Sequence, residues 1–158
     1  MRKLRAFLGL VTLLALVSPP AFADQAATYV EYQRQALRGE REVAVRANVD
    51  LTPKEAEAFW PLYREYHAER DRLGDRTYKL IREYADAYNS KRVTDEQAQR
   101  WVKEALELDE DRAKLKERYM QKFSTILPGR KFARYYQIET KLDNVINAKL
   151  SAEIPLVE

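Results

Sequence analysis

Few side chains in this 158-residue chain could do chemistry. The chain has no Cys and a single His, so it lacks thiolate ligands and the two or three imidazoles of a typical zinc site. Its four Gly residues are scattered singly, which leaves no glycine-rich loop for a phosphate. The one imidazole, His67, stands between Tyr66 and Ala68 without a pattern of acceptors around it. A packed or half-exposed histidine is therefore favoured over a catalytic one.

Acidic and hydroxyl side chains do not form a recognisable active site either. The run Glu107–Asp111 is acidic enough to suggest calcium, but on a helix its side chains point in different directions and the coordinating loop is missing. Beyond residue 23 the serines are Ser90, Ser124 and Ser151, and none occurs in a nucleophile-elbow sequence. We therefore predict that the protein is not an enzyme and has no catalytic residue, cofactor or metal site.

Aromatic residues are the best candidates for binding. Tyr and Trp combine apolar area with a polar tip and are common at contact surfaces. The alternative is that they fill the core of a thin bundle. Trp60 and Tyr136 lie off the main apolar stripe, so they are the more exposed candidates. The candidate client-binding or partner-binding residues are Phe59, Trp60, Tyr63, Tyr66, Tyr135 and Tyr136.

The elements that must position these side chains are helices. Two capping boxes mark helix starts, one formed by Thr52 and Glu55 and the other by Thr94 and Gln97. Apolar residues then recur with the spacing of one helix face, and no segment alternates with the period of a strand. We predict a single all-α domain over residues 24–150, with helices at about 27–47, 53–88, 95–126 and 130–150, followed by a short apolar tail at 151–158.

The two middle helices are too long for a compact domain. At 1.5 Å per residue each spans roughly 50 Å, whereas a compact domain of this size has a diameter of about 35 Å. A short loop joins them, so they should form an antiparallel hairpin against which the other helices pack. We expect an elongated, cradle-like four-helix bundle. Such a thin body leaves apolar surface to be covered by a second subunit, a partner or a client.

Residues 1–23 have the three parts of a secretory signal peptide. Three basic residues precede the apolar run Ala6–Val17, which is well short of the roughly 20 residues that span a bilayer. Small residues at Ala21 and Ala23 fit a cleavage site. We expect cleavage after Ala23 and export of a soluble protein that retains no integral membrane segment.

Removal of the signal changes the charge balance. The chain has 28 basic and 25 acidic residues, and three of the basic ones belong to the signal. The exported part is therefore formally neutral. Nucleic-acid binding normally requires a basic surface, so we expect no nucleic-acid partner.

The helix starts resemble those of a known family. Leu51-Thr52-Pro53-Lys54-Glu55 and Val93-Thr94-Asp95-Glu96-Gln97 are similar to the Leu-Thr-x-x-Gln motifs of the Spy/CpxP-like periplasmic proteins. The stretch Ile126–Phe132 stands where that family's second motif would open the last helix. Glu55 takes the place of the motif's Gln, Val93 takes the place of its Leu, and the last start lacks Thr.

This resemblance implies a cradle-shaped homodimer in the periplasm. Members of the family act as ATP-independent chaperones, as inhibitory partners of envelope-stress sensors, or as metal-responsive proteins. The last role is not expected here, because the chain lacks imidazole-rich segments.

Two functional hypotheses follow, and an enzyme is the third and least favoured. The first is a periplasmic, ATP-independent chaperone that binds unfolded proteins or exposed apolar segments through an amphipathic helical surface. The second is a regulatory or structural partner of an envelope-stress sensor or another envelope protein. A chaperone should protect many clients, whereas a dedicated partner should form a single stable complex.

Overall fold

The computed structural model describes residues 39–157, and all regular secondary structure in that part of the chain is helical. The prediction of an all-α fold is confirmed. Residues 39–48 are helical. They are followed by three long helices, which are α2 (Pro53–Asn89), α3 (Asp95–Ile126) and α4 (Gly129–Glu153).

Reciprocal hydrogen bonds fix the starts of α2 and α3. The Glu55 amide donates to Thr52 Oγ1 (3.3 Å), and the Thr52 amide donates to Glu55 Oε2 (2.7 Å). At the start of α3 the Gln97 amide donates to Thr94 Oγ1 (3.3 Å), and the Thr94 amide donates to Gln97 Oε1 (3.1 Å). Each box satisfies backbone donors that the first turn of a helix leaves without partners. Both predicted capping boxes are present.

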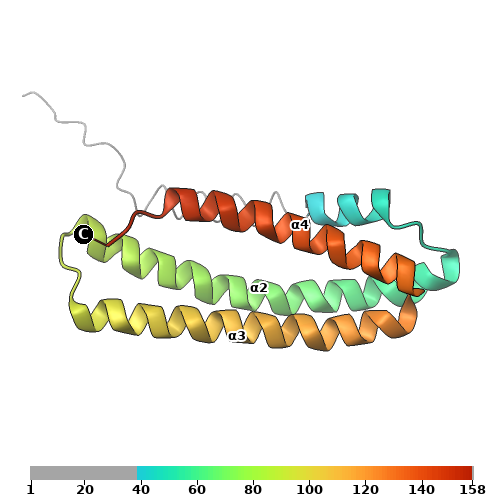
Figure 1. Ribbon diagram of the computed structural model, residues 1–158, viewed down its shortest axis with the longest axis horizontal. Coiled ribbons are helices and arrows are strands. Elements are labelled where there is room, and N and C mark those ends of the chain that lie inside the picture. Colours follow the sequence, from blue (N-terminus) through green and yellow to red (C-terminus); the bar gives the residue numbers. More distant parts are fainter. Residues whose placement is uncertain (1–38, 158) are drawn as a thin grey trace, which may run out of the picture.

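The bundle is elongated, as Figure 1 shows. Helices α2 and α3 run side by side and antiparallel, and their 37 and 32 residues correspond to about 55 and 48 Å. Helix α4 turns back at Leu127–Pro128 and diverges from the hairpin toward its other end. The segment 39–48 lies beside α4 (Figure 1). The three long helices are therefore closer together at one end than at the other.

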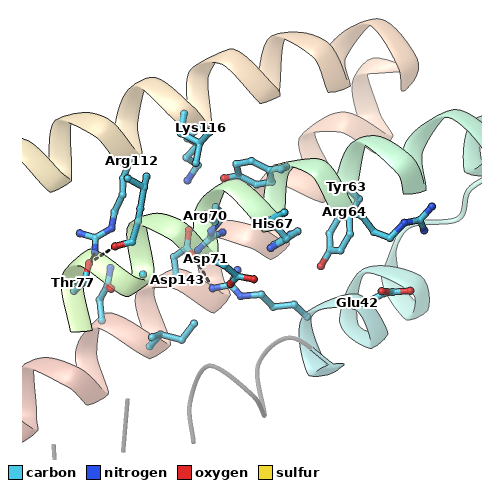
Figure 2. Close-up of a pocket in the computed structure, with 18 of the residues that line it drawn as sticks. Glu42, Tyr63, Arg64, His67, Arg70, Asp71, Thr77, Arg112, Lys116 and Asp143 are labelled. Carbon is cyan, nitrogen blue, oxygen red and sulfur yellow. Dashed lines mark hydrogen bonds and ion pairs between the residues drawn. The ribbon is translucent and has the colours of Figure 1, made fainter. Parts of the chain in front are cut away.

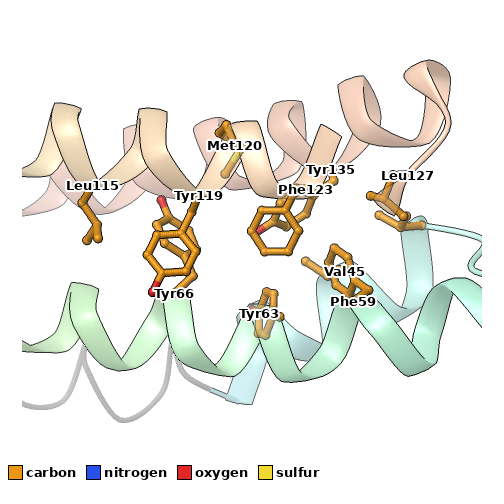
Figure 3. Close-up of a cluster of buried hydrophobic side chains, with 11 residues drawn as sticks. Val45, Phe59, Tyr63, Tyr66, Leu115, Tyr119, Met120, Phe123, Leu127 and Tyr135 are labelled. Atoms are coloured by element: carbon orange, nitrogen blue, oxygen red, sulfur yellow. The ribbon is translucent and has the colours of Figure 1, made fainter. Parts of the chain in front are cut away.

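An aromatic core holds the tightly packed end together (Figure 3). The Phe59 ring of α2 lies 5.0 Å from the Tyr135 ring of α4 and 5.1 Å from the Phe123 ring of α3. Tyr66 and Tyr119 pair across the hairpin at 5.1 Å. Such ring pairs contribute about 0.5–1.5 kcal/mol beyond the burial of their area. Val45 of the segment 39–48 and Val49, which follows this segment, pack in the same core.

This core corrects the expectation for four of the six candidate binding aromatics. The side chains of Phe59, Tyr63, Tyr66 and Tyr135 are buried within the chain itself. They do not form a surface, because α4 and the segment 39–48 cover the stripe that the α2–α3 hairpin leaves open. At these four positions the alternative of a thin-bundle core is the correct one.

The ends of the described part differ from the expected boundaries. Helix α4 continues through Glu153, so the expected tail at 151–158 begins in the structure at Ile154. Ile154 is extended (φ −93°, ψ 113°) because the following Pro155 disfavours the helical conformation of the residue before it. The predicted signal peptide with its cleavage site, most of the helix expected at 27–47, and residue 158 lie outside the described residues.

Candidate functional site

Trp60 and Tyr136 are the two candidate aromatics outside the buried core, and a cation lies over each ring. The Arg46 guanidinium carbon is 3.7 Å from the centroid of the half-buried Trp60 ring. Lys116 Nζ is 4.7 Å from the centroid of the Tyr136 ring, whose residue is 43% exposed. Cation–π contacts at exposed sites contribute about 0.5–1 kcal/mol. Of the six candidates, only Tyr136 is substantially accessible to a partner.

A cavity of about 470 Å³ lies where α4 diverges from the hairpin. Small-molecule sites in proteins typically measure roughly 300–1,000 Å³. Figure 2 shows the cavity between α2, α3, α4 and the segment 39–48. We call it the α4 groove. Its α2 wall runs from Tyr63 to Thr77, a length of about 21 Å along the helix.

The lining of the α4 groove combines polar and aliphatic side chains. One end is polar and includes Tyr63, His67, Arg70 and Asp143. Toward Thr77 the aliphatic side chains of Leu73, Leu115, Ile146 and Leu150 come from all three long helices, interspersed with the polar side chains of Thr77, Arg112 and Asn147. Leu115 also belongs to the buried core, and Leu73 packs against that core. The groove is therefore amphipathic.

Four charged side chains form a buried cluster at the polar end, which we call the arginine–carboxylate cluster. Arg41 donates to Glu139 Oε2 (2.8 Å) and to Asp143 Oδ1 (2.6 Å). Arg70 donates to the same two oxygens, at 3.0 and 2.6 Å. Glu139 is fully buried, and the other three side chains are at most one quarter exposed. The cluster ties α4 to α2 and to the segment 39–48.

The electrostatics of the cluster favour its charged form. Burial by itself would raise the pKa of Glu139, but His67 and the two arginines hold that pKa below its ordinary value. Burial likewise opposes ionisation of Asp143, and the guanidinium groups of Arg70 and Arg41 lower its pKa. The pKa of Arg70 is raised because Asp143, Tyr66 and Glu139 outweigh its own desolvation. The two positive and two negative charges thus balance inside the protein.

His67 borders this cluster. Its Nε2 lies 3.4 Å from Glu139 Oε1, but neither atom makes a hydrogen bond of acceptable geometry. The imidazole packs on the Tyr63 ring at 4.1 Å, and its side chain is 19% exposed. His67 is therefore a packed histidine, the alternative that the sequence favours. Among residues 39–157, no serine lines the α4 groove. The Tyr63 hydroxyl is also buried without a hydrogen-bond partner.

Sequence reasoning missed the arginine–carboxylate cluster, although a signal for it exists. On α4, core positions follow the alternating three- and four-residue spacing of Phe132, Tyr135, Glu139 and Leu142. On α2, Arg70 occupies the equivalent register between Tyr66 and Leu73. A charged residue at a core register on each of two helices indicates a buried ion pair. A stripe of apolar residues alone does not reveal such a pair.

The acidic run of α3 is engaged in ion pairs. Asp111 pairs with Arg76 at 2.5 Å, Glu110 with Lys114 at 2.6 Å, and Asp109 with Arg112 at 3.0 Å. Over residues 39–157 there is no group of three or more acidic or imidazole side chains that could hold a metal ion.

Within the described range, none of the helices combines the length and apolar character needed to cross a membrane. In comparisons with known proteins, no family model, no curated protein and no solved structure matches this chain.

Proposed function

We propose that this protein is an exported, periplasmic binding protein that shields unfolded proteins or exposed apolar segments without ATP, and that the α4 groove receives them. The single observation that supports this most is the groove itself. It is a long amphipathic cavity on an elongated bundle, lined in part by aliphatic side chains from three helices. It takes the place of the aromatic stripe as the binding surface, because most of that stripe is buried.

The chemistry of the groove suits reversible binding. Burial of apolar area contributes roughly 25 cal/mol per Å², so an incoming leucine or phenylalanine side chain gains free energy against Leu73, Leu115 and Ile146. Arg112 and Lys116 also line the groove from α3, and the aliphatic stems of these side chains extend its apolar wall. A cavity of about 470 Å³ holds a few side chains rather than a folded domain. Binding one segment weakly and releasing it needs no nucleotide.

One surface feature supports the alternative, a dedicated envelope partner or a second copy of the chain. Val102 and Leu106 lie on adjacent turns of α3, and their side chains are exposed (61% and 65%). An apolar pair of this kind is typical of a contact surface when it belongs to a larger patch. A homodimer or a fixed complex formed through this face would leave the α4 groove free for clients.

An aggregation assay tests the proposal. The protein without residues 1–23 should suppress aggregation of a chemically unfolded client at a near-stoichiometric ratio in the absence of ATP. Ile146→Asn, which places an amide in the groove, should reduce this protection. Val145→Asn is the matched control, because Val145 is the neighbouring residue of α4, is 53% exposed and does not line the groove. If the unmutated protein gives no protection at several-fold excess, the chaperone hypothesis is refuted. If both variants lose protection equally, the groove is not the client-binding surface.

A further inference from the structure

The α4 groove has the features of a site for a small molecule. Between the levels of Tyr63 and Thr77 on α2, a length of about 21 Å, its lining combines charged side chains with the aliphatic side chains of Leu73, Leu115, Ile146 and Leu150. A molecule with one polar head and one flexible aliphatic chain would match it.

The charge of Lys116 favours a negatively charged head group. Lys116 lines the groove from α3, donates to Thr140 Oγ1 (3.2 Å) and lies over the Tyr136 ring. Among residues 39–157, no carboxylate comes within ion-pair distance of its Nζ. By contrast, the positive charges of Arg41 and Arg70 are balanced by Glu139 and Asp143. Figure 2 shows Lys116 reaching toward the space between the helices.

Buried polar atoms at the same end also lack partners. The Tyr63 hydroxyl is buried without a hydrogen-bond partner, and the residue lines the groove while being only 3% exposed. His67 Nε2 is also buried without a hydrogen-bond partner, as is Glu139 Oε1 at 3.4 Å from it. A buried polar group without a partner costs about 1–3 kcal/mol. A polar head group, with the water that accompanies it, would supply acceptors to this end of the cavity.

We propose that the α4 groove binds a single-chain amphiphile with a carboxylate head, the chemical class of long-chain fatty acids. The carboxylate pairs with Lys116 at the polar end, and the aliphatic chain lies against Leu73, Leu115 and Ile146 and reaches Leu150. This site goes beyond the binding of protein segments, and it stands whether or not the protein protects unfolded clients. Where both activities exist, the amphiphile competes with the client for the aliphatic side chains.

Direct binding measurements with palmitate test the proposal. Displacement of a dansyl-labelled fatty acid gives the affinity for palmitate, and cetyl alcohol provides the same chain without the carboxylate. We expect palmitate to bind more tightly than cetyl alcohol. Lys116→Met retains the apolar stem and removes the charge. It should weaken the binding of palmitate by about tenfold, the value of one charge-assisted contact, and leave the binding of cetyl alcohol unchanged.

Two further variants separate this site from nonspecific adsorption. Lys114→Met removes a lysine of the same helix that pairs with Glu110 and is 67% exposed, so it should bind palmitate normally. Leu150→Ser should weaken palmitate and cetyl alcohol alike, and circular dichroism should show unchanged helix content in all three variants. Equal loss in the Lys114 and Lys116 variants, or no loss in either, would overturn the carboxylate site. Saturable binding of neither ligand, or attachment to anionic phosphatidylglycerol vesicles without palmitate binding, would overturn the proposal as a whole.

Discussion

Replacing Glu139 by Gln removes one charge from the arginine–carboxylate cluster and nearly preserves its shape. The amide oxygen can still accept one hydrogen bond, but Arg41 and Arg70 then face a single carboxylate, that of Asp143. One positive charge is left uncompensated at a site where Glu139 itself has no exposed surface. The variant therefore measures what the buried charge balance contributes to folding.

The expected cost is large compared with the stability of a domain. Removing one partner of a buried ion pair typically costs about 3–5 kcal/mol, and whole domains have unfolding free energies of roughly 5–15 kcal/mol. At about 4 °C per kcal/mol for a domain of this size, the melting temperature should fall by roughly 12–20 °C. Glu107→Gln is the matched control. Glu107 is 54% exposed, and its single ion pair among the described residues, with Lys103, is long (3.9 Å) and exposed to solvent. It should change stability by less than about 0.5 kcal/mol.

Urea unfolding followed by far-ultraviolet circular dichroism gives both values. The two variants should share the slope of the unmutated protein and differ in midpoint. Adding Arg41→Met to Glu139→Gln should restore part of the loss, because the second change removes the uncompensated charge, and a double-mutant cycle measures this coupling. If Glu139→Gln unfolds within about 1 kcal/mol of Glu107→Gln, the cluster does not hold α4 in place and the reasoning is refuted.

Three further predictions can be tested with the same preparations. Because the pKa values of Glu139 and Asp143 are depressed in the folded state, their contribution to stability is complete above the unfolded-state values of about 4. This contribution is lost as pH falls through the folded-state pKa values. Urea midpoints measured from pH 7 to pH 3 should therefore be constant and then decline, less steeply in Glu139→Gln. A midpoint that rises on acidification would contradict the lowered pKa values. Thr94→Ala should cost about 1 kcal/mol through loss of the α3 cap, and Thr94→Ser should retain most of that stability in the same assay. Intact-protein mass spectrometry of the exported product should give the mass of residues 24–158, and a mass that retains residues 1–23 would contradict signal cleavage.

Helix boundaries were predictable because their causes are local. Thr52 and Thr94 each interact with a residue three positions further on, so a capping box can be recognised from five residues of sequence. The observed end of α4 lies three residues beyond the predicted one, and its cause is also local. Pro155 disfavours the helical conformation of Ile154, so the helix continues only through Glu153.

The distribution of buried and exposed side chains was less predictable, because it depends on contacts between distant helices. Phe59 is buried by Phe123 and Tyr135, which lie more than 60 residues away in the chain. The hairpin alone would expose its aromatic stripe. The turn at Leu127–Pro128 fixes the end at which α4 begins, but how far α4 follows the hairpin depends on contacts such as that of Glu139 with Arg70.

The position of client contacts tests the central claim, that the α4 groove is the binding surface, most directly. A photo-crosslinking amino acid placed at Ile146 lies within the groove, and the same amino acid at Val145 faces away from it. On illumination with an unfolded client, we predict crosslinks from position 146 and few from position 145, with palmitate reducing the former. Crosslinks of equal yield from both positions, or from position 145 alone, would contradict the account.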